Sequence, residues 1–382
     1  MTKKYDVIII GAGAAGLSAA SVALGAGKRV LILEMGNAPA RKVAISGGGR
    51  CNITNADANV DRYFGKNPDF VRGALSRYTP ADVLQWCKKH NLNLEEKTTG
   101  RFFCTNGADA VVQALIQDSQ GADVHYDTQI TDIEKVDNMF VINDFCAPSV
   151  IVATGGVSWG AVGVSDAGYK IAKKFGHKIV PVRPALCALK ISGANADLAG
   201  ITMDAEITVG KRTLRDSLLL THFGIGGPLA YRASLNDLNN GFYLNLLPDV
   251  NVADFLKTQK NQCGGKSLVS ILSDILPKRI AKKVIGENTK NIADVSNTEI
   301  EQIAQKLTKI FIPGDKISLH GLSAAEVVRG GIDTADVSSK TMESKLCSGL
   351  FFAGEVLDIA GDLGGFNLHW AWASGYVAGM NA

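Results

Sequence analysis

The chain has 382 residues, enough for two or three domains, and its 46% hydrophobic and 20% charged residues are typical of a globular protein. A formal net charge of only +3, without a basic stripe or interleaved aromatic side chains, argues against nucleic acid as a partner. The seven scattered cysteines include no C-x-x-C pair and the histidines lack metal-ligand spacing, so we expect no metal and a reducing, cytoplasmic location.

The first predicted elements are a strand at residues 5–10, a helix of small residues, and a second strand at 29–33. Gly11, Gly13 and Gly16 join the first strand to the helix with G-x-G-x-x-G spacing, the dinucleotide-binding fingerprint in its full strand–helix–strand context. In this motif the backbone N–H groups at the helix start bind a pyrophosphate, and the second glycine lets the backbone approach it.

Glu34 ends the second strand, 23 residues after Gly11, where a carboxylate accepts both hydroxyls of an unphosphorylated ribose. A 2′-phosphate would be repelled there, so FAD or NAD is expected rather than NADP. A membrane-spanning or signal segment is the alternative interpretation, because residues 7–27 form an uncharged run of 21 residues behind Lys3 and Lys4. The fingerprint spacing and the apolar character of buried parallel strands explain these residues better.

Residues 41–55 are expected to form a flexible loop rich in hydrogen-bond donors, because three consecutive glycines occupy 47–49. Arg50 and Asn52 would supply donors to a polar ligand, although an ordinary surface turn would have the same composition. Cys51 is interpreted as a small packing residue rather than a nucleophile, because nothing in the sequence indicates a lowered thiol pKa.

The pattern of predicted helices and strands changes twice between the first and the last segment of the chain. The predicted elements up to residue 175 are helices at 68–76, 80–90, 108–117 and 166–175, and strands at 101–103, 124–126, 130–136, 140–142 and 150–153. Pro181 and Pro184 predict a stiff exit from the first domain. Strands at 188–191, 205–209 and 242–246 then surround a glycine-rich turn at 221–228, and a polar helical stretch covers 252–310. The last segment again has the pattern of the first one, an apolar strand at 350–353, then glycines, then a helix at 366–380.

Ordered motifs extend along the chain beyond the fingerprint: RK…SGGGRCN at 41–52, GRFF at 100–103, ATGG at 153–156, THFGI at 221–225, RGG at 329–331, MESK at 342–345 and GEVLD…GGFNL at 354–368. With these motifs nearly the whole chain resembles the BaiN/YhiN-type family of FAD-dependent oxidoreductases, within the two-dinucleotide-binding-domain flavoproteins. The chain departs from the family pattern at Cys104, residues 162–167, Gly226 and His369, where the family often has other residues. These departures leave the substrate open.

The resemblance implies an α/β fold, with a Rossmann-like FAD-binding domain of the glutathione-reductase type and an inserted β-rich domain bearing a small helical subdomain. The expected boundaries are 1–184 for the first part of the FAD-binding domain, 185–317 for the insert and 318–382 for the last part. It also implies non-covalent FAD. The expected FAD-binding residues are Gly11, Ala12, Gly13, Ala14, Ala15, Gly16, Glu34, Met35, Lys42, Ser46, Gly47, Gly48, Gly49, Arg50, Cys51, Asn52, Ile130, Ala153, Thr154, Gly155, Gly354, Glu355, Asp358, Gly365, Phe366, Asn367 and Leu368.

His222 and His369 lie nearest to glycine-rich motifs, and we expect them to be catalytic proton donors, although a lone histidine is more often structural. The expected activity is hydride transfer between FAD and a small organic substrate or NAD(P)H, in a pocket that the insert covers as a lid. No second G-x-G-x-x-G is present, so NAD(P)H would bind only transiently. Enone reduction, amine oxidation and a non-catalytic flavoprotein, either a redox sensor or an RNA-associated factor, remain open.

Overall fold

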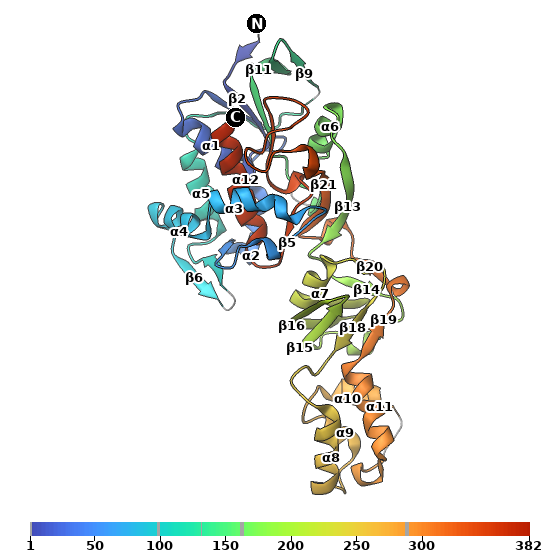
Figure 1. Ribbon diagram of the computed structural model, residues 1–382. Helices are drawn as coiled ribbons and strands as arrows, with labels where there is room; N and C mark the ends of the chain where they lie inside the picture. The colour runs from blue at the N-terminus through green and yellow to red at the C-terminus, as the bar shows by residue number, and fades with distance from the viewer. Residues whose placement is uncertain (1, 98–99, 131, 161–163, 287–289) are drawn as a thin grey trace. The chain divides into compact units, whose positions relative to one another are not determined.

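The computed structural model describes residues 2–97, 100–130, 132–160, 164–286 and 290–382. The chain forms two compact units, each with its own hydrophobic core: unit 1 comprises residues 1–185 and 322–382, and unit 2 comprises residues 186–321 (Figure 1). The three-part domain division at 184 and 317 stays a prediction. Of the segment that departs from the family pattern, Val162 and Gly163 lie outside the described residues.

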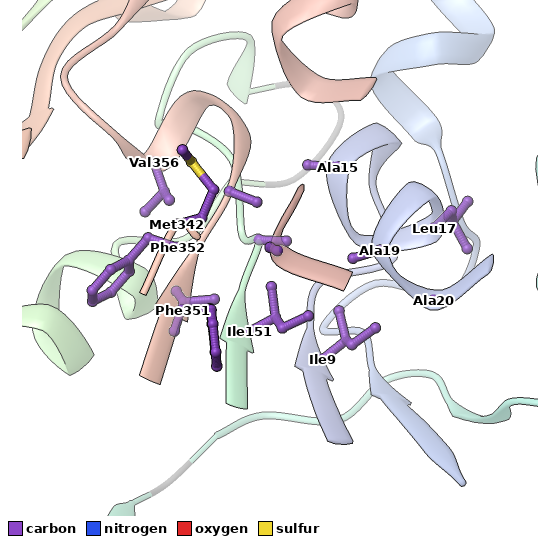
Figure 2. Close-up of a cluster of buried hydrophobic side chains, with 14 of the residues drawn as sticks. Ile9, Ala15, Leu17, Ala19, Ala20, Ile151, Met342, Phe351, Phe352 and Val356 are labelled. Carbon is purple, nitrogen blue, oxygen red and sulfur yellow. The ribbon is translucent and has the colours of Figure 1, made fainter. Parts of the chain in front are cut away.

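Unit 1 is built on a five-stranded parallel sheet with the strand order β22-β12-β2-β3-β8. The strands are β2 (Val7–Ile10), β3 (Val30–Leu33), β8 (Asp123–His125), β12 (Ser149–Val152) and β22 (Leu350–Phe352). All residues of β2 and β3 are buried, which explains why both strands are apolar throughout rather than alternating. Figure 2 shows Ile9, Ile151 and Phe351 side by side on three neighbouring strands of this sheet.

Two long helices, α1 (Ala14–Gly25) and α12 (Phe366–Asn381), pack closely against each other over this sheet. Small residues make the close approach possible. A Cβ at Gly375 would lie 2.3 Å from the carbonyl oxygen of Ala15, and a Cβ at Gly379 would lie 2.5 Å from that of Ala19. The end of the chain is thereby held against the first helix of the fingerprint (Figure 1).

The remaining elements of unit 1 surround this layer. A four-stranded sheet has the order β1-β11-β10-β9 (Lys3–Lys4, Phe145–Ala147, Met139–Ile142, Ile133–Val136), and its β10 and β11 contact β12 and β2. Smaller sheets are β4-β7-β6 (Asn52–Asn55, Arg101–Cys104, Leu94–Lys97) and β23-β5 (Ala360–Gly361, Tyr63–Phe64). The shorter helices are α2 (Arg41–Gly49), α3 (Arg72–Arg77), α4 (Pro80–Lys89), α5 (Ala108–Asp118) and α6 (Ala167–Lys174).

Two segments of unit 1 differ from the sequence predictions. Residues 41–55, expected as one loop, form α2 at 41–49 and β4 at 52–55. The helical geometry of α2 breaks at Ser46, and Gly47 and Gly48 have positive φ. The segment with Pro181 and Pro184, expected as an exit linker, is a strand, β13 (Ile179–Ala185), paired antiparallel with β21 (Val327–Ile332). Prolines fit there because this sheet has only two strands and its register shifts between Val180 and Arg183.

Unit 2 contains a seven-stranded antiparallel sheet with the order β19-β18-β15-β16-β17-β14-β20. Its strands are β14 (Leu189–Ile191), β15 (Thr202–Val209), β16 (Arg212–Thr221), β17 (Gly224–Gly226), β18 (Phe242–Asn245), β19 (Ile310–Ile312) and β20 (Ile317–Leu319). Helix α7 (Gly227–Ser234) packs on β15 and β16. Between β18 and β19 the chain forms α8 (Val252–Gln262), α9 (Leu268–Leu272), α10 (Lys278–Ile285) and α11 (Asn297–Thr308), a separate helical group in Figure 1. The predicted α/β class with a β-rich insert bearing helices is confirmed.

Candidate functional site

The carboxyl ends of β2, β3, β12 and β22 meet at one edge of the parallel sheet, where open α/β folds bind their ligands. Gly11 follows β2 and has φ of +105°. A Cβ there would lie only 2.6 Å from the carbonyl oxygen of Ala153, which follows β12. Glycine is therefore required at this position for two separate reasons.

Gly13 is the N-cap of α1 and lies beside open space. No heavy atom lies within 4 Å of the position that a Cβ would take, and its φ of −81° is ordinary for any residue. No side chain caps the helix, and its first turn contains no acidic residue. The first N–H groups of this twelve-residue helix have no side-chain cap in the described structure, and the space beside Gly13 is open, which fits the pyrophosphate of a dinucleotide.

The carboxylate of Glu34 is 9% exposed and lies against the same turn. Its Oε2 accepts a hydrogen bond from the N–H of Ala12 at 2.7 Å, and its Oε1 accepts one from the N–H of Gly36 at 2.7 Å. The Arg41 guanidinium donates to Oε1 at 3.2 Å, an interaction that sequence reasoning missed. These bonds orient the carboxylate, and since Oε1 accepts two of them and Oε2 one, acceptor capacity remains on Oε2. A ribose contact at Glu34 stays a prediction.

We expect Glu34→Ala to weaken FAD binding by about 1–3 kcal/mol, the value of hydrogen bonds from ribose hydroxyls to a charged acceptor. Titrating apoprotein with FAD by fluorescence measures the dissociation constant. Asp6→Ala is the matched control. Asp6 also accepts a backbone N–H, that of Arg29 at 2.8 Å, but this bond lies before β2 and β3, at the edge of the sheet opposite to Glu34. Equal losses of affinity in the two variants would show that Glu34 acts only on the fold.

The glycine-rich turn after α2 brings several expected site residues together. Gly47 has φ of +58°, and a Cβ there would lie 2.7 Å from the Asn52 nitrogen. Arg50 lies over the Phe103 ring at 5.3 Å. Cys51 is fully buried, and burial raises its thiol pKa to about 12, so it is protonated, in keeping with the packing interpretation. The side-chain oxygen of Asn52 is buried without a hydrogen-bond partner among the described residues.

Lys42 and Glu355 form a half-buried ion pair at this edge, with 2.9 Å between Nζ and Oε2. Lys42 also donates to the Ser158 hydroxyl at 2.8 Å, which lies 3.2 Å from Glu355 Oε1. The N–H of Val328 donates to the same oxygen at 3.0 Å. This network joins four segments that are distant in sequence, and Ser158 is a member that sequence reasoning missed.

A second set of polar groups lies around the end of β12 and the start of α12. The hydroxyl of Thr154 is buried without a partner among the described residues. Gly365 is the N-cap of α12, which has no side-chain cap and no acidic residue in its first turn. The Asn367 side chain is bonded to both the N–H and the carbonyl of Gly361, so it fixes this loop. The Asn52 side-chain oxygen lies close to Gly365, 3.0 Å from the position that a Cβ there would take. This unpaired acceptor and the N–H groups at the start of α12 fit a ligand with several polar edges, such as a flavin.

Three expected FAD-binding residues have surroundings that do not point to a ligand. Met35 is exposed, and Ile130 packs against the core of unit 1. Asp358 is buried and accepts the N–H groups of Lys66 and Gly330, at 2.8 and 3.0 Å. Burial raises the pKa of this carboxyl. The geometry gives Asp358 a role in joining loops, and its FAD contact stays a prediction.

The two histidines expected to be catalytic occupy opposite environments. His222 is exposed on the turn between β16 and β17 in unit 2, with its ring edge-on to Phe223. His369 is fully buried in α12, with Nδ1 at 2.8 Å from the Thr54 hydroxyl and no partner at Nε2 among the described residues. Burial lowers the pKa of His369 to about 4, so the ring is neutral near pH 7, which weighs against a proton shuttle there.

We expect His369 to make stability fall in mild acid. The unfolded chain binds a proton at the ordinary pKa of 6.5 and the folded chain only at about 4. The unfolded state therefore holds more protons between these values, and the free energy of unfolding falls as pH falls through that window. Between about pH 7 and pH 5, urea unfolding should show that the native chain loses about 2 kcal/mol more than His369→Gln. Parallel losses in the two proteins would contradict this. His177, also buried with a lowered pKa, is present in both and cancels.

Among the described residues, no helix is both long and apolar enough to span a membrane, and no group of three His, Cys, Asp or Glu side chains is placed to hold a metal. A cytoplasmic location stays a prediction.

Nearly the whole chain matches one protein family. The family model described as the HI0933-like protein Rossmann domain matches residues 5–381. The chain belongs to this family. This match confirms the resemblance seen in the sequence motifs. FAD is the cofactor of this HI0933-like oxidoreductase.

Three curated relatives and one solved structure are similar to this HI0933-like chain. Proteins named ribosomal RNA dihydrouridine synthase, from Escherichia coli (strain K12) and Haemophilus influenzae, are each 34% identical, over 99% and 100% of this chain and 98% and 99% of their own lengths. A protein named 3-dehydro-bile acid delta(4,6)-reductase, from Clostridium scindens, is 28% identical over 98% of each chain. A quinol-fumarate reductase solved with menaquinol molecules has a TM-score of 0.51 and 16% identity, covering 99% of this chain and 70% of that one, and shows a shared fold alone.

Proposed function

We propose that this chain is an FAD-dependent reductase that converts uridine in ribosomal RNA into dihydrouridine. The observation that carries the proposal is the 34% identity, over nearly the full length of both chains, to two proteins named for that activity. It replaces the expectation that nucleic acid is no partner, which rested on composition alone.

The chemistry needs a hydride, a proton and a rigid site. In uridine the C5=C6 double bond is conjugated to the C4 carbonyl, so a hydride adds at C6 and a proton at C5. Bound FAD supplies the two-electron chemistry. The chain's own residues would bind and orient it: the start of α1 at Gly13 holds the pyrophosphate, and Asn52 and the start of α12 hold the polar edge of the ring. His222, exposed on its turn, is the candidate proton donor.

A second candidate is reduction of a small enone. The Clostridium scindens relative, at 28% identity, is named as a reductase of an unsaturated bile acid. Saturating a carbon–carbon double bond conjugated to a carbonyl is the same reaction type in both cases. Both reactions therefore need the same groups, a hydride from reduced FAD and a proton donor. We propose NADH or NADPH as the electron donor in either case. It would bind only transiently, because no second dinucleotide fingerprint provides a resident site.

The test uses the purified FAD-loaded protein in two steps. NADH and NADPH are first mixed with it separately while the visible flavin absorbance is followed, and bleaching by either identifies the donor and excludes a non-catalytic flavoprotein. Ribosomal RNA transcribed in vitro is then added with that donor, and its nucleosides are analysed by mass spectrometry. Dihydrouridine at a discrete site is the expected result. Reoxidation of the flavin by a steroid enone, without any dihydrouridine in the RNA, would overturn the proposal in favour of the second candidate.

A further inference from the structure

Helix α10 carries four exposed cationic side chains and no acidic residue. Lys278, Arg279, Lys282 and Lys283 are exposed, whereas Ile280 on the opposite side is buried in the core of unit 2. In a helix the spacings 278/282 and 279/283 place both pairs on one side, one turn apart. The sequence analysis expected a polar helical stretch here but did not identify this basic face, which the bounds of α10 and the burial of Ile280 define.

The three lysines of this face have no acidic partner among the described residues. No carboxylate of the described residues lies within ion-pair distance of them, although other lysines of the helical group are paired, Lys257 with Glu301 at 2.7 Å for example. Arg279 differs, because its guanidinium donates to the backbone carbonyls of Asp197 and Ala199, at 2.9 and 3.2 Å. Like charges one turn apart destabilise a helix, so the arrangement favours a ligand of opposite charge.

The charge of the whole chain is concentrated in the same unit. Residues 186–321 contain 16 basic and 13 acidic side chains, whereas the rest of the chain contains 24 of each, so the entire net charge of +3 belongs to unit 2. A cationic helix face on the more basic unit is the electrostatic pattern of a surface that contacts a polyanion.

We infer that Lys278, Lys282 and Lys283 bind the phosphate backbone of the RNA substrate. This inference rests on the proposed function for the identity of the polyanion. Flexible lysine side chains in two rows suit successive phosphates and do not depend on the base sequence. An anionic membrane fits less well, because the apolar side chains of α10 pack against the core of unit 2, with Ile280 and Ala281 buried, and are not available to enter a lipid surface as a continuous face.

The test compares the FAD-loaded native protein with a triple variant, Lys278→Gln, Lys282→Gln and Lys283→Gln. Arg279 is kept because it holds two carbonyls. Binding of ribosomal RNA transcript is measured across a series of salt concentrations. We expect the dissociation constant of the triple variant to rise about tenfold or more near physiological salt, and its dependence on log salt to become shallower by about 2–3, near one per lost phosphate contact. A Lys→Arg triple variant should retain native binding.

The matched control removes three exposed lysines from unit 1, Lys88→Gln, Lys173→Gln and Lys178→Gln, which are also outside any ion pair of the described residues. Unchanged RNA binding in this control supports the inference. Native-like RNA binding by the α10 variant, equal weakening in both variants, or loss of binding only to phosphatidylserine vesicles would each overturn it. Dihydrouridine formation separates the two proposals. RNA binding through α10 without dihydrouridine removes the proposed function alone, whereas dihydrouridine formation with unaltered binding in the α10 variant removes this inference alone.

Discussion

Replacing Gly13 by valine should remove FAD from the protein while leaving its fold intact. The valine side chain would enter the open space beside the N-terminus of α1, where no protein atom lies within 4 Å of a Cβ. The backbone at Gly13 has φ of −81° and ψ of −173°, which valine adopts without strain. Loss of two or more hydrogen bonds from backbone N–H groups to a pyrophosphate corresponds to an affinity loss of about 100-fold or more.

The measurement is the flavin content of the purified variant, followed by FAD titration and thermal unfolding of the apoprotein. Gly16→Ala is the matched control, because a Cβ at Gly16 would lie 1.9 Å from the carbonyl oxygen of Gly11. That variant should lose stability as well as FAD, whereas Gly13→Val should melt close to the native apoprotein. Native FAD affinity in Gly13→Val would contradict the assignment of this turn to the pyrophosphate.

Most of the parallel sheet could be predicted from sequence because β2, β3 and β22 are short, continuous apolar runs and β12 is apolar after its first residue. Residues 7–10 and 30–33 are buried throughout, as strands covered on both faces of a parallel sheet are. The hairpin strand β16 was missed, although Leu214 and Leu218 face the core, because polar residues interrupt the alternation between them. Its partner β15 pairs with it over eight residues, and this pairing, which the local pattern does not show, fixes the strand.

Glycine and proline both led to the prediction of irregular structure where a regular element forms. The glycines after Ser46 predicted a loop, yet Val43 packs into the core and forms a helical turn before they break it. Pro181 and Pro184 predicted a linker, yet an edge position and a register shift accommodate both in β13. Local chemistry identifies residues that disturb regular structure, but tertiary packing decides whether an element forms around them.

The residues of the candidate site also fall into two groups, those that local sequence predicts and those that tertiary packing brings together. Gly11, Gly13 and Glu34 follow one strand–helix–strand unit, so their proximity was predictable from spacing. The partners of Glu355 come from α2, from the segment after β12 and from β21. The local sequence around each of them does not predict these contacts. Burial likewise decides the state of His369, whose motif position gave no sign of a pKa near 4.

Glu355→Ala should be the most destabilising single change at this edge of the sheet, lowering the free energy of unfolding by about 3 kcal/mol. Removing the carboxylate leaves the half-buried Lys42 ammonium without its charge partner and the N–H of Val328 without its acceptor. Glu355→Gln should cost less, since an amide oxygen still accepts from Val328. Urea unfolding of the apoproteins measures both, so that changes in FAD binding do not enter the comparison.

The matched control is Glu343→Ala, because Glu343 accepts the N–H of Gly349 at 2.8 Å just before β22, whereas Glu355 lies just after it. Glu343 has no lysine partner in the described structure, so we expect a loss of only about 1 kcal/mol. A cycle with Lys42→Met isolates the ion pair: the double variant should be more stable than the sum of the single losses predicts, by about 1 kcal/mol or more. Strictly additive losses in the free energy of unfolding in the cycle, or equal losses in Glu355→Ala and Glu343→Ala, would show that the ion pair of Lys42 and Glu355 does not stabilise this edge of the sheet.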